Sequence, residues 1–332
     1  MLKTDVEVLR SIVSPVFLEW LIKTNYSFCK ESKVSVLSIG DNDHYLVESK
    51  NNSYVLRVYR YNKHWLHNED SYLFEIDLLL FLKQNGIPVS YPLPMDNSSY
   101  IDTIQAPEGQ RYFILFSKAT GKMMAFDEDS FYHYGAMIAK FHSVSNHFKS
   151  QYQKTPIDVK FLIDLPVKRI NTVFYSIYKN AVDSLNVLAE DLRSKINDFH
   201  ANILSDEYGI IGGDFHGGNH FHELNNTQKI TLFDFDLCGY GWRVYDIAVL
   251  KWELFVENTI HEIPNRISLW KAFLNGYNSN RALNNQELNM INIFIQVRQI
   301  WMIGSKLTYP DIGLNDYYFN KMFEQLKIAQ EQ

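Results

Sequence analysis

A glycine-rich segment and a strand-like segment in the second half of the chain place three oxygen-bearing side chains at a fixed spacing. The first segment, residues 212–219, reads Gly-Gly-Asp-Phe-His-Gly-Gly-Asn and holds Asp214 and Asn219 five residues apart. Asp234 follows fifteen residues after Asn219, near the end of an apolar run. Because glycine permits positive φ and close backbone approach, we expect these side chains on tight loops.

Residues that favour β-strands precede both loops, from Tyr208 to Ile211 and from Ile230 to Phe233. The interval between the loops suits a short hairpin with Asn225 and Asn226 at its tip. The pattern therefore predicts a loop, a hairpin and a second loop in immediate succession.

The three side chains match the needs of phosphoryl transfer. Kinase chemistry uses one carboxylate to orient the attacking hydroxyl and accept its proton. An amide oxygen and a second carboxylate hold Mg²⁺ against the nucleotide phosphates. An Asp, an Asn and a second Asp at arbitrary spacing also occur in most soluble chains, so the glycines and the flanking strands carry the argument.

At these residues the chain resembles the aminoglycoside phosphotransferase family, a broad kinase-like group that includes choline, homoserine and fructosamine kinases. The family pattern reads His-Gly-Asp-x-His-x-x-Asn, followed by a hydrophobic residue and Asp-Phe-[Asp/Glu/Gly]. The resemblance implies an α+β, two-lobed protein kinase-like fold with a small antiparallel-sheet N-lobe and a mainly helical C-lobe. It also implies that Asp214 is the catalytic base and that Asn219 and Asp234 bind the metal.

The similarity continues over residues 239–248, where the family's counterpart of Asp246 anchors the catalytic loop. Gly212 departs from the pattern, because the family has a histidine there that packs within the loop, so the rigidity of this loop is in question. Asp236 is expected to assist the metal or the substrate. His216 either contacts substrate or nucleotide, or is structural.

The chain has 332 residues, of which 46% are hydrophobic, enough for two lobes. We expect an N-terminal nucleotide-binding lobe at 1–116, a hinge at 117–121 and a C-terminal catalytic and substrate lobe at 122–332. The net charge of −6 argues against a nucleic-acid partner. Two cysteines are too few for a disulfide framework and favour a reducing cytoplasm. No apolar run approaches the ~20 residues that span a bilayer, so no membrane association is expected.

Alternating apolar residues from Val34 to Tyr61 predict two or three antiparallel strands. Gly40 opens the connection between the first two, where a kinase has its phosphate-covering loop. An ordinary turn explains a single glycine equally well. Asp41 and Asp43 would repel phosphate unless they point away or meet a cation.

Arg57 lies at the strand position where many kinases carry the lysine that pairs with the α- and β-phosphates. A guanidinium can bridge a phosphate and a carboxylate, although a solvated arginine at a strand edge is the simpler alternative. Its expected partner is Glu75, on a helix from about Asn68 to Gln84. Glu69 competes for this role, but six residues of helix turn it roughly 120° away, so only one of the two faces Arg57.

A strand from Arg111 to Phe116 leads into the segment 117–121, which resembles the family's hinge. The resemblance implies that adenine is bound by backbone groups near Ser117 and Ala119, with Phe116 as gatekeeper. Backbone recognition leaves little trace in side chains, so the sequence does not decide between ATP and GTP. ATP is expected as co-substrate, and GTP is not excluded.

Three functions remain open. The resemblance favours a Mg²⁺-dependent kinase of a small-molecule hydroxyl substrate, in the amino alcohol, amino acid or aminoglycoside class. Glu253 and Glu257, four residues apart, either face such a cationic substrate or form a solvated helix face. The alternatives are a stress-response-type Ser/Thr protein kinase and a non-catalytic nucleotide-binding module. The oligomeric state cannot be read from the sequence.

Overall fold

The computed structural model divides the chain into two compact units. The first comprises Met1–Ala119 and Ser150–Gln153, and the second comprises Thr120–Lys149 and Lys154–Gln332. The division falls inside the segment 117–121 that the sequence suggests as a hinge. The structure describes residues 7–50, 52–223, 226–257, 263–309 and 316–332.

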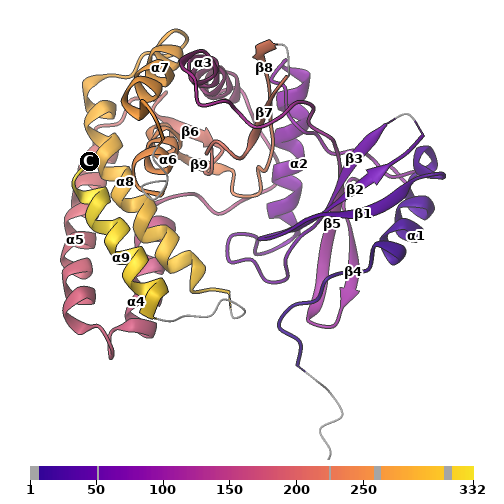
Figure 1. The fold of residues 1–332 in the computed structure, drawn as a ribbon, viewed down its shortest axis with the longest axis horizontal. Coiled ribbons are helices and arrows are strands. Elements are labelled where there is room, and N and C mark those ends of the chain that lie inside the picture. Colours follow the sequence, from indigo (N-terminus) through magenta and orange to yellow (C-terminus); the bar gives the residue numbers. More distant parts are fainter. Residues whose placement is uncertain (1–6, 51, 224–225, 258–262, 310–315) are drawn as a thin grey trace, which may run out of the picture. The chain divides into compact units, whose positions relative to one another are not determined.

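The first unit is built on a five-stranded antiparallel sheet, which confirms the predicted small sheet (Figure 1). Its spatial order is β1-β2-β3-β5-β4. In that order the strands are β1 (Lys33–Ile39), β2 (Asp43–Glu48), β3 (Ser53–Val58), β5 (Gly109–Ser117) and β4 (Asp102–Ala106).

One face of this sheet and helix α1 (Pro15–Asn25) enclose the core of the first unit. Leu18 and Ile22 of α1 are fully buried with Tyr45 and Val47 of β2, which lie two residues apart on one face of the strand. Each buried side chain of this size contributes about 1.5–3 kcal/mol to the free energy of unfolding. A short 3₁₀ turn, η1 (Ser27–Cys29), follows α1.

Helix α2 (Glu69–Gln84) begins at Asn68, whose side chain accepts a hydrogen bond from the Ser71 amide. Such a cap satisfies an amide that has no partner inside the helix. Acidic residues occupy the first turn and Lys83 the last, as the helix dipole favours. This helix confirms the predicted range of about 68–84.

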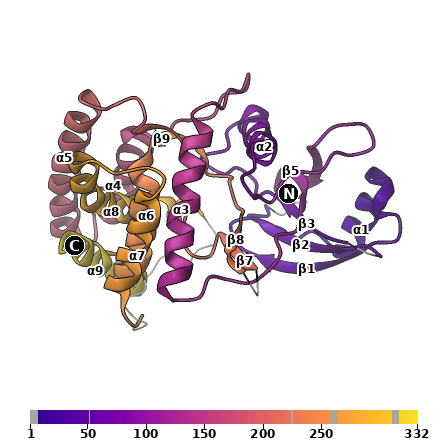
Figure 2. The ribbon, with the colours of Figure 1, turned by 90° about the horizontal axis from the view of Figure 1, so that it is seen from above.

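The second unit is mainly helical, and its described residues also form two small two-stranded antiparallel sheets, β6-β9 and β7-β8. Figure 2 shows α3 and α7 running side by side. The elements are α3 (Glu128–Ser145), the π-helix η2 (Lys160–Asp164), α4 (Leu165–Phe174), α5 (Lys179–Ala201), β6 (Tyr208–Ile211), β7 (His220–Glu223), β8 (Asn226–Leu232), β9 (Gly239–Trp242), α6 (Arg243–Phe255), α7 (Arg266–Asn278), α8 (Asn285–Lys306) and α9 (Asp316–Gln330).

Two glycines allow α3 and α7 to pack closely. A Cβ atom on Gly135 would lie 2.0 Å from the Phe273 carbonyl oxygen, and one on Gly276 would lie 1.8 Å from that of Tyr132. Any larger residue would push the helices apart. Within the described parts of the chain, no helix is long and apolar enough to cross a membrane.

Candidate active site

The loop that follows β6 is tied to helix α6 by one buried carboxylate. Asp246 accepts hydrogen bonds from the amides of Gly212 (2.8 Å) and Gly213 (2.7 Å). A Cβ atom on Gly212 would lie 2.4 Å from the ring of Phe215, so this ring fills the space beside the glycine. The missing histidine therefore leaves a loop that is still fixed, by Asp246 and by Phe215.

Asp246 is itself held by His142 of α3. The His142 Nε2 atom lies 3.0 Å from Asp246 Oδ2, and Nδ1 lies 2.8 Å from the Tyr277 hydroxyl. Burial lowers the pKa of His142 well below its ordinary value, so the imidazole is neutral at physiological pH. Burial raises the pKa of Asp246, and its two amide donors oppose that shift. His142 is thus a packed structural residue.

Asp214 presents its carboxylate at the end of this loop. Its side chain is 28% exposed, and its Oδ1 atom accepts a hydrogen bond from Arg298 Nη2 of α8. The other oxygen, Oδ2, lies 3.9 Å from His216 Nε2. Nothing in the sequence pointed to Arg298, which lies 84 residues away.

Asn219 and Asp234 come together because β7 pairs with β8. His220 is paired with Leu232, and the Phe233 amide donates to the Asn219 carbonyl oxygen at 3.0 Å. This confirms the predicted hairpin; of its expected tip, residue 225 lies outside the described residues and residue 226 begins β8. The structure thus brings both proposed metal ligands to one end of the hairpin.

The donor set of these two residues fits Mg²⁺. The Asn219 side-chain amide donates from Nδ2 to the Asp214 carbonyl oxygen at 2.9 Å, which leaves Oδ1 as an acceptor. Asp234 has φ of 63°, a left-handed conformation that costs about 1–3 kcal/mol and is typical of functional sites. In the described part of the chain no three His, Cys, Asp or Glu residues form a metal cluster. Mg²⁺ prefers oxygen ligands and commonly takes one or two carboxylates plus nucleotide phosphates.

Glu253 of α6 supports the same loop. Its Oε2 atom accepts from the Gly217 amide at 2.6 Å, and the Gly218 amide donates to His216 Nδ1 at 3.0 Å. Burial raises the pKa of Glu253. Glu257, just beyond the end of α6, is exposed. The two glutamates thus differ, because Glu253 is engaged with the loop whereas Glu257 faces solvent.

In the first unit, Arg57 of β3 and Glu75 of α2 form the predicted ion pair. Arg57 Nη1 donates to Glu75 Oε1 at 2.9 Å, and the Tyr59 hydroxyl donates to Glu75 Oε2 at 3.0 Å. Arg57 and Glu75 are buried, so Arg57 is not a solvated edge residue. Glu69 is exposed in the first turn of α2, on another face of the helix. Tyr59 was not anticipated as a third member.

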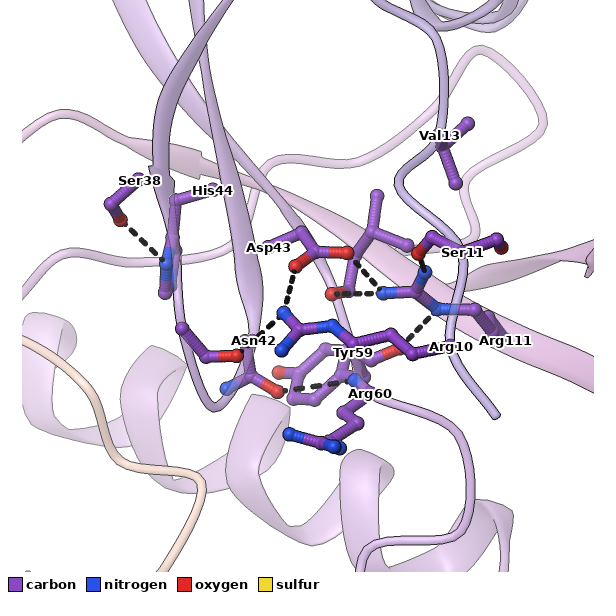
Figure 3. Close-up of polar contacts among 12 residues, drawn as sticks. Arg10, Ser11, Val13, Ser38, Asn42, Asp43, His44, Tyr59, Arg60 and Arg111 are labelled. Carbon is purple, nitrogen blue, oxygen red and sulfur yellow. Dashed lines mark hydrogen bonds and ion pairs between the residues drawn. The ribbon is translucent and has the colours of Figure 1, made fainter. Parts of the chain in front are cut away.

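The connection from β1 to β2 is fixed by two arginines (Figure 3). Arg10 donates to the Gly40 carbonyl oxygen at 2.7 Å and contacts Asp43 at 2.5 Å. Arg111 binds the other oxygen of Asp43 at 2.6 Å. Asp43 is fully buried between these cations, so its charge is compensated and does not oppose phosphate binding near Gly40.

Of the two residues expected to bind a nucleobase, Ser117 and Ala119, the first has main-chain hydrogen bonds within its own unit. The Ser117 amide donates to the Tyr91 carbonyl oxygen at 2.9 Å, and its carbonyl oxygen accepts from the Ser90 hydroxyl. The amide of Ser117 is therefore engaged within the first unit. This leaves Ala119 as the better candidate for contacts with a nucleobase.

Comparison with known proteins places the chain in a family. It matches the phosphotransferase enzyme family over residues 34–282. An uncharacterized protein of Synechocystis sp. is 30% identical over 87% of this chain and 78% of that protein. Amicoumacin kinase of Bacillus subtilis is 24% identical over 84% of this chain and 81% of that kinase.

Solved structures show the same fold. A microcompartment-associated aminopropanol kinase has a TM-score of 0.78 at 20% identity and is covered over 95% of both chains. An amicoumacin kinase in complex with AMP-PNP, Ca²⁺ and Ami has a TM-score of 0.77 at 20% identity, over 96% of this chain and 94% of that one. Because the family match spans most of the chain and includes both loops, the protein belongs to the phosphotransferase enzyme family and is a kinase with an alcohol group as acceptor.

Proposed function

We propose that this kinase transfers the γ-phosphoryl group of ATP to a hydroxyl of a small molecule that also carries an amine. The amino alcohol, amino acid and aminoglycoside classes are the candidates. The observation that carries the proposal is the joined geometry of Asp214, Asn219 and Asp234. The Asn219 amide contacts the Asp214 main chain, and the Asn219 main chain contacts the residue before Asp234.

In this mechanism Asp214 accepts the proton of the acceptor hydroxyl. A bond forms between the hydroxyl oxygen and the γ-phosphorus, and the bond from the γ-phosphorus to the bridging oxygen breaks. The electron pair leaves with ADP. Asn219 and Asp234 would hold Mg²⁺, which would neutralise charge on the phosphates. The rest of the rate enhancement comes from positioning, because Asp246 fixes the loop amides before the substrate binds.

The nucleotide contacts are assigned to the first unit. Arg57, oriented by Glu75, binds the α- and β-phosphates, and the main chain near Gly40 covers them. The Ala119 main chain binds the nucleobase, and since main-chain contacts do not distinguish the two nucleotides, ATP is the proposed co-substrate and GTP is not excluded.

Three residues that depart from a typical kinase site, Gly212, Arg57 and Asp43, are each compatible with catalysis. Gly212 makes room for Phe215, so the loop is packed without the family's histidine. Arg57 forms an ion pair with Glu75, as the corresponding lysine of other kinases does with a glutamate. Asp43 lies between two cations and does not repel phosphate. An active kinase is therefore the better reading of this chain.

The acceptor class rests on two supports. Two similar proteins are an amicoumacin kinase and an aminopropanol kinase, and the second name denotes an amine-bearing alcohol as acceptor. In this chain the carboxylates of Asp214 and Glu253 lie on either side of His216, at 3.9 Å from its two ring nitrogens. Such a pair of acids suits an ammonium group close to the reacting hydroxyl. We place the reaction in the cytoplasm, in keeping with two free, buried cysteines.

The test is ADP release from Mg²⁺ and ATP against a panel of amino alcohols, hydroxy amino acids and aminoglycosides. ADP release should rise when compounds of one of these classes are added, and this rise should vanish in Asp214→Asn. Asp191→Asn, which removes an exposed carboxylate paired with Lys195 on α5, is the matched control and should behave as wild type. If no compound stimulates ADP release and phosphate is instead transferred to an added protein or to the kinase itself, the result would support a protein kinase.

A further inference from the structure

The cation beside Asp214 comes from a helix that the catalytic motifs do not include. Arg298 lies in the middle of α8, and its side chain is 3% exposed. Its Nη2 atom donates to Asp214 Oδ1, and its Nη1 atom lies 3.4 Å from the Tyr245 hydroxyl. Arg298 is therefore buried behind the carboxylate, on the side away from solvent.

Two indole rings hold this guanidinium in place. Its central carbon lies 4.7 Å from the centroid of the Trp301 ring and 5.2 Å from that of Trp252. Trp252 is fixed in turn, since its Nε1 atom donates to Gln299 Oε1 at 2.8 Å. Gln299 also donates to the Met322 carbonyl oxygen at 2.9 Å. A cation held by rings and by a carboxylate has little freedom to move.

The pair is asymmetric in a way that suits catalysis. Arg298 is almost fully buried, whereas Asp214 is partly exposed. The arginine is therefore less accessible to an acceptor than the carboxylate that it contacts. Because one carboxylate oxygen is occupied by the guanidinium, the other oxygen is the one left for the acceptor hydroxyl.

We propose that Arg298 is a positioning residue that sets the orientation of the Asp214 carboxylate, with Oδ1 held and Oδ2 turned to the acceptor. The inference rests on the proposed function of Asp214 as base. Arginine suits this task better than lysine, because its planar fork contacts Asp214 and Tyr245 together and stacks on indole rings. A misplacement of about 1 Å at a reacting group can cost on the order of 100-fold in rate.

One test needs no substrate. In a crystal structure of Arg298→Gln, the Asp214 carboxylate should turn away from its wild-type orientation or occupy two orientations. The bonds from Gly212 and Gly213 to Asp246 should persist. Asp214 in its single wild-type orientation would overturn the inference. If Arg298→Gln does not fold, Arg298→Lys serves in its place, because it keeps the buried charge and lacks the fork.

The second test is kinetic. Arg298→Gln should lower kcat on the order of 100-fold while the KM for ATP stays within about twofold. Arg298→Lys should recover part of the loss. Added guanidinium should raise the rate of Arg298→Ala, which a purely structural defect would not allow. Arg193→Gln, which removes a guanidinium bound to Asp164 and Glu190, is the matched control and should keep wild-type kcat.

The outcomes separate the two proposals. An active wild type with an equally active Arg298→Gln overturns the role of Arg298 and leaves the kinase function standing. If no acceptor stimulates the wild type but the orientation of Asp214 still depends on Arg298, the acceptor proposal is overturned and the positioning role is supported.

Discussion

Arg57 and Glu75 form a buried ion pair between strand β3 and helix α2, with Nη1 and Oε1 2.9 Å apart. The pair is closed on its other side by the Tyr59 hydroxyl, which donates to the second carboxylate oxygen. Arg57 is thereby held in one orientation before a nucleotide binds, and the cost of ordering it on binding is reduced.

Glu75→Gln tests this pre-organisation. The neutral amide still fits but no longer compensates the buried guanidinium, and an uncompensated buried charge costs about 3–5 kcal/mol. We expect a lower melting temperature and a KM for ATP raised at least tenfold. Glu69→Gln on the same helix is the control, since this residue is exposed, and it should change neither quantity measurably. Equal effects of the two substitutions would argue against the pair.

Asp246→Asn tests the anchor of the catalytic loop. Asn offers one acceptor oxygen where Asp246 offers two, so one of the amides of Gly212 and Gly213 loses its partner. An unsatisfied buried amide costs about 1–3 kcal/mol. The expected result is reduced stability in urea unfolding together with a large loss of kcat. A variant that loses stability but keeps kcat would show that the loop does not need this anchor.

Arg10→Ala tests the attachment of the segment near Gly40. The substitution removes the bond to the Gly40 carbonyl oxygen and one of the two cations at Asp43. Nucleotide binding measured by calorimetry should weaken by roughly tenfold, or about 1.4 kcal/mol. Lys23→Ala, which removes a cation paired with Glu19 on α1, should leave nucleotide affinity unchanged. Arg10→Ala binding as tightly as wild type would count against this attachment.

Glu253→Gln tests the effect of pH on stability. Burial raises the pKa of Glu253 above its unfolded value, so the folded state binds more protons and stability falls as pH rises through that range. Glutamine keeps an acceptor for the Gly217 amide without the charge. The gain in melting temperature over wild type should be larger at pH 8 than at pH 5. Glu257 is exposed, so Glu257→Gln should show no such difference between the two pH values. A gain in melting temperature for Glu253→Gln that is the same at both pH values would refute the raised pKa of Glu253.

Much of the site was predictable because its parts are local. The spacing of the two loops predicts the β7-β8 hairpin, and helix periodicity allows only one of Glu75 and Glu69 to face Arg57. The family resemblance supplied the two-lobed fold, and the match to the phosphotransferase enzyme family confirms it.

The remaining parts depend on contacts between distant segments. Arg298 meets Asp214 across 84 residues, and Arg111 meets Asp43 across 68. The sequence spacing predicts neither contact, because helix and strand periodicity indicates only which face of an element is buried. The engaged amide of Ser117 was missed for the same reason, since its partner Tyr91 lies in a separate segment.

The most direct test of the central claim compares Mg²⁺-dependent ATP binding and phosphoryl transfer in Asp214→Asn and Asp234→Asn. Asp214→Asn should bind Mg²⁺ and ATP as wild type does, with transfer abolished, because the carboxylate acts on the acceptor. Asp234→Asn should lose the Mg²⁺-dependent part of ATP binding, because its carboxylate holds the metal. Equal binding and equal residual transfer in the two variants would contradict the assignment of base and metal ligand.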